Sequence, residues 1–239
     1  RTLIGLIIGN EKYELVSATC LPGEDEEGLD IGLLAGKPKI AKELTSDTST
    51  LFRSSDVLID FTVPEAAMLH AQKCYENDMS IVIGTTGLVA SQEKELLFLS
   101  KKIPIVYSAN FSVGVTLLSN LVSNATKILG KEWDIEILEM HHKYKIDAPS
   151  GTALMLGKSA SDARDQVLSD VKATSRDGIV GKRNSEEIGF AVLRGGDVVG
   201  EHSVLFCNEG ERIELVHKAT NRSIFASGAL RAAYWAATA

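Results

Sequence analysis

The chain has 239 residues, of which 44% are hydrophobic and 24% are charged. This is the composition of an ordinary globular protein, and the length suits either one large domain or two modest ones. The formal net charge of −7 argues against nucleic acid as a general partner.

The three cysteines, Cys20, Cys74 and Cys207, are scattered along the chain and have neither zinc-site nor redox-motif spacing. Such a sparse, odd set is typical of a reducing compartment, so we expect the protein in the cytoplasm. The apolar run at residues 3–8 is too short to cross a bilayer, and no signal-peptide architecture follows it. We therefore expect no membrane partner.

The first 42 residues give three weak local patterns. Residues 2–8 predict an apolar helix that ends at Gly9, and residues 14–19 predict a strand. Residues 21–42 are rich in glycine and acids, which predicts a solvated loop.

Strand and helix patterns then alternate along the chain. The strands are expected at residues 56–60, 80–84 and 103–108, and the helices at residues 64–77 and 91–101. Pro64 stands at the first turn of its helix, the position that proline favours. This order predicts an α/β, Rossmann-like doubly wound parallel sheet with ligands at the carboxyl ends of its strands.

Three loops fall at those carboxyl ends, at residues 61–64, 84–87 and 108–111. Their small and hydroxyl-bearing residues would let a flat cofactor approach the backbone closely. The alternative is that strand-to-helix turns use Gly, Thr and Asn in any case.

The second half of the chain predicts a different architecture. A helix begins at Ser112 and ends at Gly130, a strand covers residues 134–140, and a helix covers residues 153–167. Residues 169–187 are expected to be irregular, and residues 188–194, 198–207 and 211–217 to be strands. Gly195-Gly196 predicts a two-residue hairpin, and residues 208–210 predict a second turn.

These elements predict a second α+β domain at residues 112–221, with a mixed or antiparallel sheet and a packed helix. Residues 1–111 and 222–239, which end in a helix at residues 227–235, would form the first domain. His202 and His217 lie within strands and are expected to be satisfied structural residues. His70 lies on a predicted helix and has no visible catalytic partner.

The loop between the strand at residues 134–140 and the following helix is rich in positive charge. It contains His141, His142, Lys143 and Lys145, and it ends in Asp-Ala-Pro-Ser-Gly-Thr at residues 147–152. Ser150 and Thr152 are good N-cap residues, and a helix N-terminus favours a carboxylate or phosphate. The loop therefore suits a small anion with more than one acidic group, beside residues that can pass a proton.

Two other interpretations of this loop remain open. It could be a solvated basic loop that precedes an ordinary capped helix. A metal site fits less well, because adjacent histidines on an extended chain point to opposite faces and no CxxC or HxxxH accompanies them.

The run HHKYKIDAPSGTA at residues 141–153 resembles the substrate loop of the dihydrodipicolinate reductase family, whose motif is E-x-H-H-x-x-K-x-D-x-P-S-G-T-A. The segments FTVPE, GTTG and ANFSVG also resemble segments of that family, and they occur in the same order. The resemblance implies NAD(P)H-dependent reduction of 4-hydroxy-tetrahydrodipicolinate to tetrahydrodipicolinate, in the diaminopimelate route to lysine. It also implies a homotetramer held together by the second domain.

The resemblance assigns roles residue by residue. It makes His141 and Lys145 the catalytic, proton-transferring pair, and it makes His142, Ser150, Gly151 and Thr152 the residues that bind a dicarboxylate substrate. The segments GTT and ANF line the nicotinamide side of NADPH or NADH in the family, which implies cofactor-binding roles for Gly84, Thr85, Thr86, Ser108, Ala109, Asn110 and Phe111. No metal is implied.

Two departures from a dinucleotide-binding pattern stand out. The chain contains no Gly-x-Gly, and the family has a GxxGRMG loop just before the position of Arg1, so we expect the first strand and phosphate loop to precede Arg1. Cys20-Leu21-Pro22 stand where an acid or an arginine often selects NADH or NADPH, which leaves that choice open.

Two alternative functions remain. One is a related dehydrogenase of another small amino or keto acid, and the other is a non-catalytic NAD(P)-sensing module.

Overall fold

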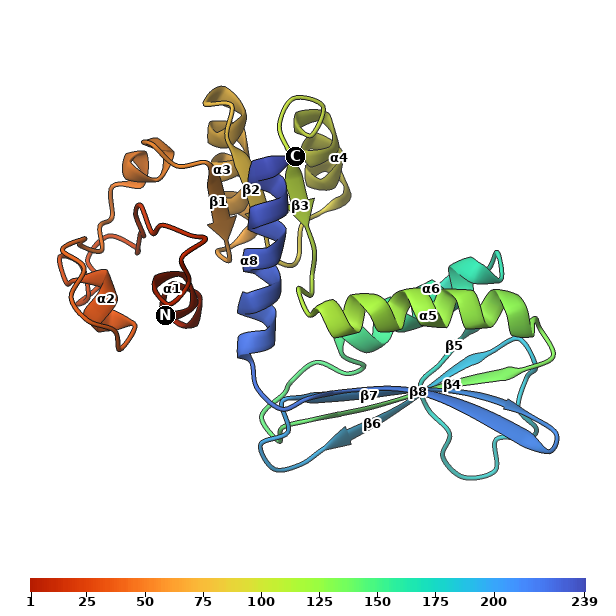
Figure 1. Cartoon of the computed structure of the whole chain (residues 1–239). Coiled ribbons are helices and arrows are strands. Elements are labelled where there is room, and N and C mark those ends of the chain that lie inside the picture. Colours follow the sequence, from red (N-terminus) through yellow and green to blue (C-terminus); the bar gives the residue numbers. More distant parts are fainter. The chain divides into compact units, whose positions relative to one another are not determined.

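The computed structural model describes residues 1–239 as two compact units (Figure 1). Arg1–Phe111 and Ser223–Ala239 form the first unit, and Ser112–Arg222 form the second. The chain passes between the units at Phe111/Ser112 and at Arg222/Ser223, the second passage lying one residue from the expected position.

The first unit contains a three-stranded parallel sheet in the order β1-β2-β3. The strands are β1 (Val57–Asp60), β2 (Ser80–Ile83) and β3 (Ile105–Tyr107), and the crossovers are α3 (Pro64–Glu76) and α4 (Ala90–Leu99). Parallel neighbours need such helical crossovers, so the predicted β-α-β-α-β order and the Rossmann-like class are confirmed.

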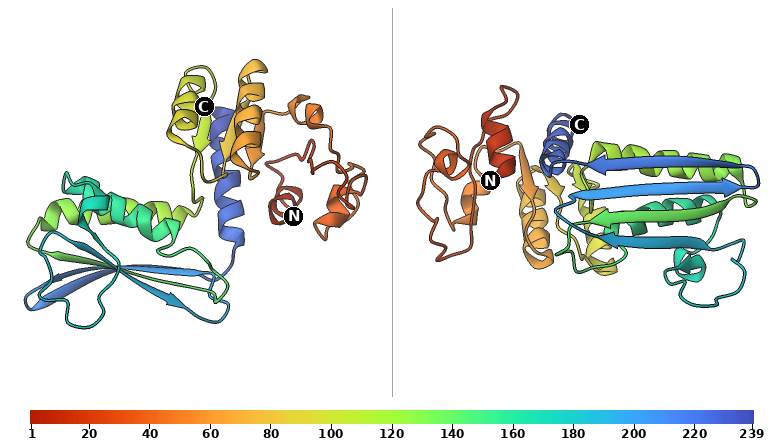
Figure 2. Two further views of the ribbon diagram at one scale, coloured as in Figure 1. Left: turned by 180° about the vertical axis from the view of Figure 1, so that it is seen from behind. Right: turned by 90° about the horizontal axis from the view of Figure 1, so that it is seen from below.

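Both faces of this sheet are covered. Ile81 and Ile83 of β2 pack with buried residues of α3 and α4, whereas Val82 between them packs with Ala229 and Ala233 of α8 (Ser223–Thr238). Consecutive strand residues point to opposite faces, which is why every residue of β2 is buried. The helices α3 and α4 therefore lie on one side of the sheet and α8 on the other (Figure 2).

The predicted strand at residues 14–19 is wrong. α1 (Thr2–Ile8) is present as expected, but residues 14–19 form only one isolated bridge, between Thr19 and Thr45. A strand needs a neighbour for its backbone groups, and this segment has no partner strand in the sheet. The expected loop at residues 21–42 contains a short helix, α2 (Ile31–Leu34), whose N-cap is the buried Asp30, and η1 (Thr48–Phe52) follows it.

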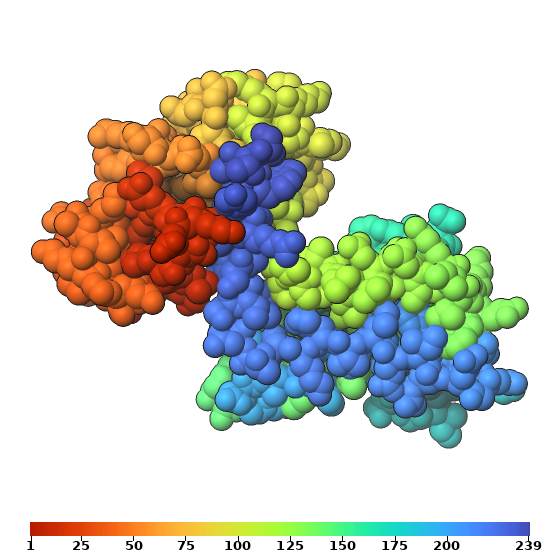
Figure 3. All heavy atoms as spheres, in the orientation of Figure 1, coloured from red at the N-terminus to blue at the C-terminus, as the bar shows by residue number.

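The second unit is a five-stranded mixed sheet in the order β5-β6-β4-β7-β8, which confirms the predicted α+β architecture. Two helices, α5 (Val113–Leu129) and α6 (Gly151–Ala163), lie on the same side of the sheet (Figure 2), and α5 runs over β8 (Figure 3). The strands are β4 (Asp134–His141), β5 (Lys172–Ala173), β6 (Ile188–Arg194), β7 (Gly200–Asn208) and β8 (Glu211–Ala219), and α7 (Leu168–Val171) precedes β5.

Two local predictions in this unit fail. α6 ends at Ala163 rather than at residue 167, since Asp165 has a left-handed backbone (φ 56°) that cannot continue a helix. β6 and β7 are not joined as a hairpin at Gly195-Gly196, because β4 lies between them and pairs with both. The second turn is confirmed, since Asn208 pairs with Glu211 across a two-residue connection.

The face of β4 that packs against α5 and α6 is apolar at the start of the strand and polar at its end. Ile135 and Ile137 are buried against α5 and α6 together with Val204 and Phe206 of β7. Glu139 and His141 follow on the same face at a spacing of two, and both are buried. The alternation of β4 therefore places two polar side chains where the apolar core ends.

Candidate functional site

Glu139 is only 1% exposed, and its carboxylate is surrounded by donors. Arg194 of β6 binds both oxygens, with Nη1–Oε2 at 2.8 Å and Nη2–Oε1 at 3.0 Å. The backbone N–H of Ser150 donates to Oε1 at 2.9 Å, and His141 Nδ1 lies 2.5 Å from Oε2. Burial acts to raise the pKa of Glu139, but these hydrogen bonds outweigh it and hold the pKa below its ordinary value.

His141 is paired to this carboxylate through Nδ1, so the hydrogen-bond network assigns the ring proton to Nδ1. Burial lowers the pKa of His141, and the charges of Lys145 and Arg194 lower it further, against the opposing effect of Glu139. The ring packs closely on β7, because a Cβ on Gly200 would lie 3.0 Å from Nε2. His141 therefore rests as a neutral imidazole.

His202 of β7 lies beside His141, with ring centroids 5.1 Å apart. Its Nε2 is 3.0 Å from the Ser150 hydroxyl, but its Nδ1 is buried without a partner. Burial lowers the pKa of His202 to about 4. The prediction that His202 is a fully satisfied structural residue is therefore wrong, because one ring nitrogen lacks a partner and the ring adjoins His141.

His217 of β8 has a similar environment one strand further on. Its Nε2 is 3.4 Å from the hydroxyl of Ser112, the N-cap of α5, and its Nδ1 is also buried without a partner. Burial lowers the pKa of His217. It too is only partly satisfied, contrary to the prediction.

The basic loop after β4 is held at several points. Lys145 Nζ lies 2.6 Å from Asp147 Oδ1, and the Arg194 Nη2 that binds Glu139 also donates to the Asp147 carbonyl at 2.7 Å. The hydrogen bond from Lys145 lowers the pKa of Asp147. His142 contacts Arg222, with Nη2–Nε2 at 3.1 Å. The structure thus adds Arg194, Asp147 and Arg222 to the predicted residues.

The start of α6 lies at the end of this loop. Ser150 is the N-cap, and its buried hydroxyl accepts from the Ala153 N–H at 3.2 Å. Its hydroxyl and its N–H are thus both engaged within the protein, which makes Ser150 an anchor for the helix start. Gly151 is exposed and Thr152 is half-buried in the first turn, where helix N–H groups point outward.

In the first unit, the loops after β1 and β2 meet at the predicted cofactor-binding edge. The ring of Phe61 lies across the backbone of Gly84, where an added Cβ would be 2.0 Å from the ring. Phe61 is 50% exposed and meets Phe111 edge-to-face at 5.8 Å between centroids. An open aromatic surface beside a bare backbone fits the flat ring of a nicotinamide, so the residues present suit such a cofactor.

Asp60, the last residue of β1, ties these two loops together. Its carboxylate accepts from the Thr62 N–H at 3.0 Å and from the Thr62 and Thr85 hydroxyls, each at 2.8 Å. His70 Nδ1 on α3 lies 2.5 Å from the other oxygen, so His70 does have an acidic partner that the sequence did not reveal. Burial acts to raise the pKa of Asp60, but the hydrogen bonds from His70, Thr62 and Thr85 outweigh it and lower that pKa.

The remaining predicted cofactor residues differ in exposure. Thr85 is buried with its hydroxyl on Asp60, whereas Thr86 and Ala109 are exposed. Ser108 closes the loop after β3 by donating to the Asn110 carbonyl at 2.8 Å and accepting from the Asn110 N–H at 3.2 Å. Thr85 and Ser108 therefore shape the loops by internal hydrogen bonds.

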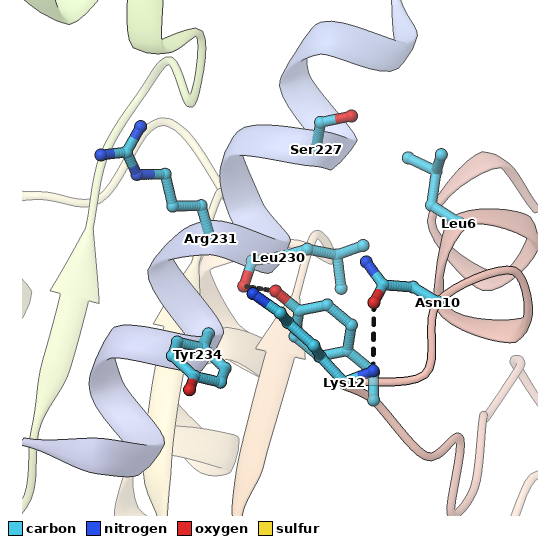
Figure 4. A pocket seen from close by; sticks show the side chains of 8 residues that line it. Leu6, Asn10, Lys12, Ser227, Leu230, Arg231 and Tyr234 are labelled. Carbon is cyan, nitrogen blue, oxygen red and sulfur yellow. Dashed lines mark hydrogen bonds between the residues drawn. The ribbon is translucent and has the colours of Figure 1, made fainter.

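The first unit also has a cavity of about 250 Å³ between α1 and α8 (Figure 4). Lys12, Tyr13, Arg231 and Tyr234 are among its lining residues, and the Tyr13 hydroxyl donates to the Leu230 carbonyl at 3.1 Å. None of the predicted cofactor residues lines it.

No group of three or more His, Cys, Asp or Glu side chains is arranged to hold a metal ion, and no helix has the length and apolarity needed to cross a membrane.

The family model described as "Dihydrodipicolinate reductase, N-terminus" matches residues 1–111, and that described as "Dihydrodipicolinate reductase, C-terminus" matches residues 114–239. The 4-hydroxy-tetrahydrodipicolinate reductase of Acinetobacter baumannii strain AYE is 47% identical over 93% of this chain and 82% of its own length. The same-named protein of Pseudomonas fluorescens strain Pf0-1 is 48% identical over 92% of this chain and 82% of its own length.

Solved structures agree at the level of fold. A dipicolinate-bound dihydrodipicolinate reductase from Paenisporosarcina sp. TG-14 matches with a TM-score of 0.74 at 24% identity, over 99% of this chain and 89% of the other. A probable dehydrogenase from Thermotoga maritima matches with a TM-score of 0.61 at 9% identity, over 96% and 81%. Family matches in both units, together with relatives at nearly half identity, establish that this chain belongs to the dihydrodipicolinate reductase family.

Proposed function

We propose that this chain catalyses the NAD(P)H-dependent reduction of 4-hydroxy-tetrahydrodipicolinate to tetrahydrodipicolinate, in the diaminopimelate route to lysine. Membership of the family across both units supports this activity. The observation that carries it is the end of β4, where a buried carboxylate orients His141 beside a lysine-bearing loop and a helix start. That arrangement combines anion binding with proton transfer.

The substrate has two carboxylates, and the loop after β4 has matching donors. We assign one carboxylate to the first turn of α6, where Gly151 and Thr152 lie at the positive end of the helix. His142, Lys145 and Arg222 supply further donors, and the contact between His142 and Arg222 brings two of them together. Binding of the dianion would draw Lys145 from Asp147, a partner that is itself more than half exposed.

Proton transfer is assigned to His141 and Lys145. His141 is neutral in the free protein, with its proton on Nδ1 and its lone pair on Nε2. A nearby substrate carboxylate favours the charged imidazole and would raise this pKa, so that Nε2 can carry a proton in the complex. Lys145 then has two tasks, holding a carboxylate and supporting protonation.

When bound, the reduced nicotinamide supplies the hydride. We assign its binding to the loops at the carboxyl ends of β1, β2 and β3, with Phe61 added to the residues predicted from the sequence. The predicted set is Gly84, Thr85, Thr86, Ser108, Ala109, Asn110 and Phe111. Asp60 would act indirectly, by holding the loops after β1 and β2 together through its hydrogen bonds with Thr62 and Thr85.

We further expect the chain to form a homotetramer through the sheet face that no helix covers. That face carries the exposed side chains of Leu138, Leu193 and Val216 on three different strands. Sedimentation velocity would test this, with Val216→Lys expected to shift the distribution to smaller species. All three cysteines are free, which suits the expected cytoplasmic location.

The activity is tested by following NAD(P)H oxidation with freshly prepared 4-hydroxy-tetrahydrodipicolinate. Turnover of this compound, in preference to a panel of small amino and keto acids, is the expected result. Preference for another acid would favour a related dehydrogenase, and cofactor binding without turnover of any substrate would favour a sensing module. Parallel titrations with NADH and NADPH would decide the cofactor preference that Cys20-Leu21-Pro22 leave open.

A further inference from the structure

Glu139 joins three separate parts of the second unit. Its carboxylate binds Arg194 of β6, the Ser150 N–H at the start of α6, and His141 on its own strand. Each oxygen therefore accepts two hydrogen bonds. A buried carboxylate with this many donors stays ionised and keeps its orientation.

Arg194 holds more than the carboxylate. The same guanidinium donates to the backbone carbonyl of Asp147, on the loop that carries Lys145. A planar, bidentate guanidinium fixes the plane of the carboxylate that it binds. Arg194 therefore links the orientation of Glu139 to the position of the basic loop.

The state of Glu139 dictates the state of His141. An ionised carboxylate can only accept, so the imidazole nitrogen that faces it must be the one that carries the proton. Nδ1 is then occupied, and Nε2 is the nitrogen that can gain and lose a proton. An added Cβ on Gly200 would lie 3.0 Å from Nε2, so the glycine keeps a side chain away from this nitrogen.

Four charged or titratable side chains surround His141, and each comes from a different part of the second unit. Glu139 comes from its own strand, Arg194 from β6, His202 from β7 and Lys145 from the basic loop. Among them, only Glu139 forms a hydrogen bond with Nδ1.

We infer that Glu139 is a positioning residue that fixes His141 as its Nδ1–H tautomer, directing proton transfer to Nε2, while Arg194 fixes the orientation of Glu139. The inference rests on the proposed function for the reaction that His141 serves. The tautomer itself is a property of the protein without substrate.

The first measurement needs no change to Glu139. Long-range ¹H–¹⁵N correlation spectra of histidine-labelled protein distinguish the two neutral tautomers, and the signals that disappear in His141→Gln identify the residue. We expect Nδ1 of His141 to carry the proton and Nε2 to be bare. A proton on Nε2 instead would overturn the inference.

The second measurement compares two carboxylates of β4. Glu136 lies on the opposite face and also binds two arginines, with Arg176 at 2.8 Å and Arg183 at 2.9 Å, but it does not touch His141. Replacing the carboxylate that orients a catalytic histidine by its amide can cost up to about 10⁴ in kcat. We expect Glu139→Gln to lower kcat by at least about 10², with a much smaller change in KM and a displaced pH profile.

Glu136→Gln is the matched control, and it should leave the His141 tautomer and the pH profile unchanged. If Glu139→Gln folds and keeps both its pH profile and its kcat, Glu139 does not position His141. If Glu139→Gln does not fold, the tautomer of the unmodified chain decides the question.

The two hypotheses fail in different ways. If the unmodified chain does not reduce 4-hydroxy-tetrahydrodipicolinate, the proposed function fails, but the tautomer measurement still tests the link between Glu139 and His141. If the unmodified chain is active and His141 has its proton on Nε2, only the positioning role is lost.

Discussion

Each unit contains a buried carboxylate paired with a histidine near the carboxyl end of a strand. Asp60 with His70 and Glu139 with His141 share the same separation of 2.5 Å, and hydrogen bonds lower the pKa of both carboxylates despite their burial. Their other partners differ. Asp60 binds the threonines of two loops, whereas Glu139 binds an arginine and a helix start.

This difference shows that the pair alone does not define a role. His70 lies on α3, so its contact with Asp60 links α3 to β1, while Thr62 and Thr85 link Asp60 to two loops. We call Asp60 with these contacts the clamp. His141 lies next to the basic loop and to a second histidine, so the Glu139 pair can direct a proton. From the neighbours of each pair we expect the Asp60–His70 pair to position loops and the Glu139–His141 pair to serve the chemistry, and the following experiments test that difference.

The largest expected effect is on the chemical step. General acid–base catalysis by a placed side chain contributes about 10²–10⁴ in rate, so His141→Gln should lower kcat by about that factor with little change in KM. His70→Gln is the matched control, and it should leave kcat close to that of the unmodified chain. Steady-state kinetics with saturating cofactor would measure both.

Two outcomes would break this assignment. A loss of kcat in His70→Gln as large as that in His141→Gln would show that both pairs serve the chemistry. Full activity in both His141→Gln and Lys145→Ala would exclude the basic loop as the catalytic site. Lys145→Ala is expected to raise KM as well as to lower kcat, because we propose that the lysine also binds a substrate carboxylate.

The next effect concerns stability against pH. His202 has a pKa of about 4 when folded and near 6.5 when exposed by unfolding. Between these values the unfolded chain binds a proton that the folded chain does not, so the free energy of unfolding should fall as pH drops from about 6.5 to about 4. A shift of this size corresponds to a loss on the order of 3 kcal/mol.

Urea unfolding at a series of pH values would measure this loss. His202→Gln should flatten the slope, whereas His142→Gln, in the basic loop, should keep it. Asp60 and Glu139 stop contributing to stability only at lower pH, because their folded pKa values lie below those of free carboxyls. Their contribution is lost as the pH falls from the unfolded pKa through the folded pKa. An unchanged slope in His202→Gln would place the responsible group elsewhere.

A third experiment tests the clamp in the first unit. Asp60→Asn keeps the shape but removes the charge that His70, Thr62 and Thr85 contact, and hydrogen bonds to a charged group contribute roughly 1.5–3 kcal/mol. We expect a lower urea midpoint and weaker NAD(P)H binding by isothermal titration. Asp56→Asn, at the exposed position one residue before β1, is the control. Unchanged cofactor affinity in a folded Asp60→Asn protein would separate the clamp from cofactor binding.

The smallest expected effect lies at the start of α6. Thr152→Val keeps the shape and removes one hydroxyl donor, so KM for the substrate should rise about tenfold. Thr152→Ser, which retains the hydroxyl, should stay close to the unmodified chain. Cofactor affinity should not change, in contrast to Asp60→Asn. Weaker cofactor binding with an unchanged KM would mean that this helix start binds the dinucleotide.

The sequence by itself determined the elements that depend on local periodicity. The strands around residues 57–60, 80–83 and 134–141 follow from apolar spacing, and the helix after Pro64 follows from the proline at its first turn. Both signals act over a few neighbouring positions. The basic loop and its helix start were also evident, because His141, Lys145 and Ser150 lie within ten residues. The uncommon motif in that loop indicated the family, which the comparisons then confirmed.

Only the tertiary structure decided the features that depend on distant partners. β4 lies between β6 and β7, so no hairpin forms at Gly195-Gly196, and residues 14–19 have no neighbouring strand to pair with. The contacts of Arg194 with Glu139 and of His202 with Ser150 span 55 and 52 residues, so no local pattern could reveal them. Strand order and buried polar pairs depend on which distant segments lie side by side in the folded chain. The spacing of residues within one segment carries no information about those contacts.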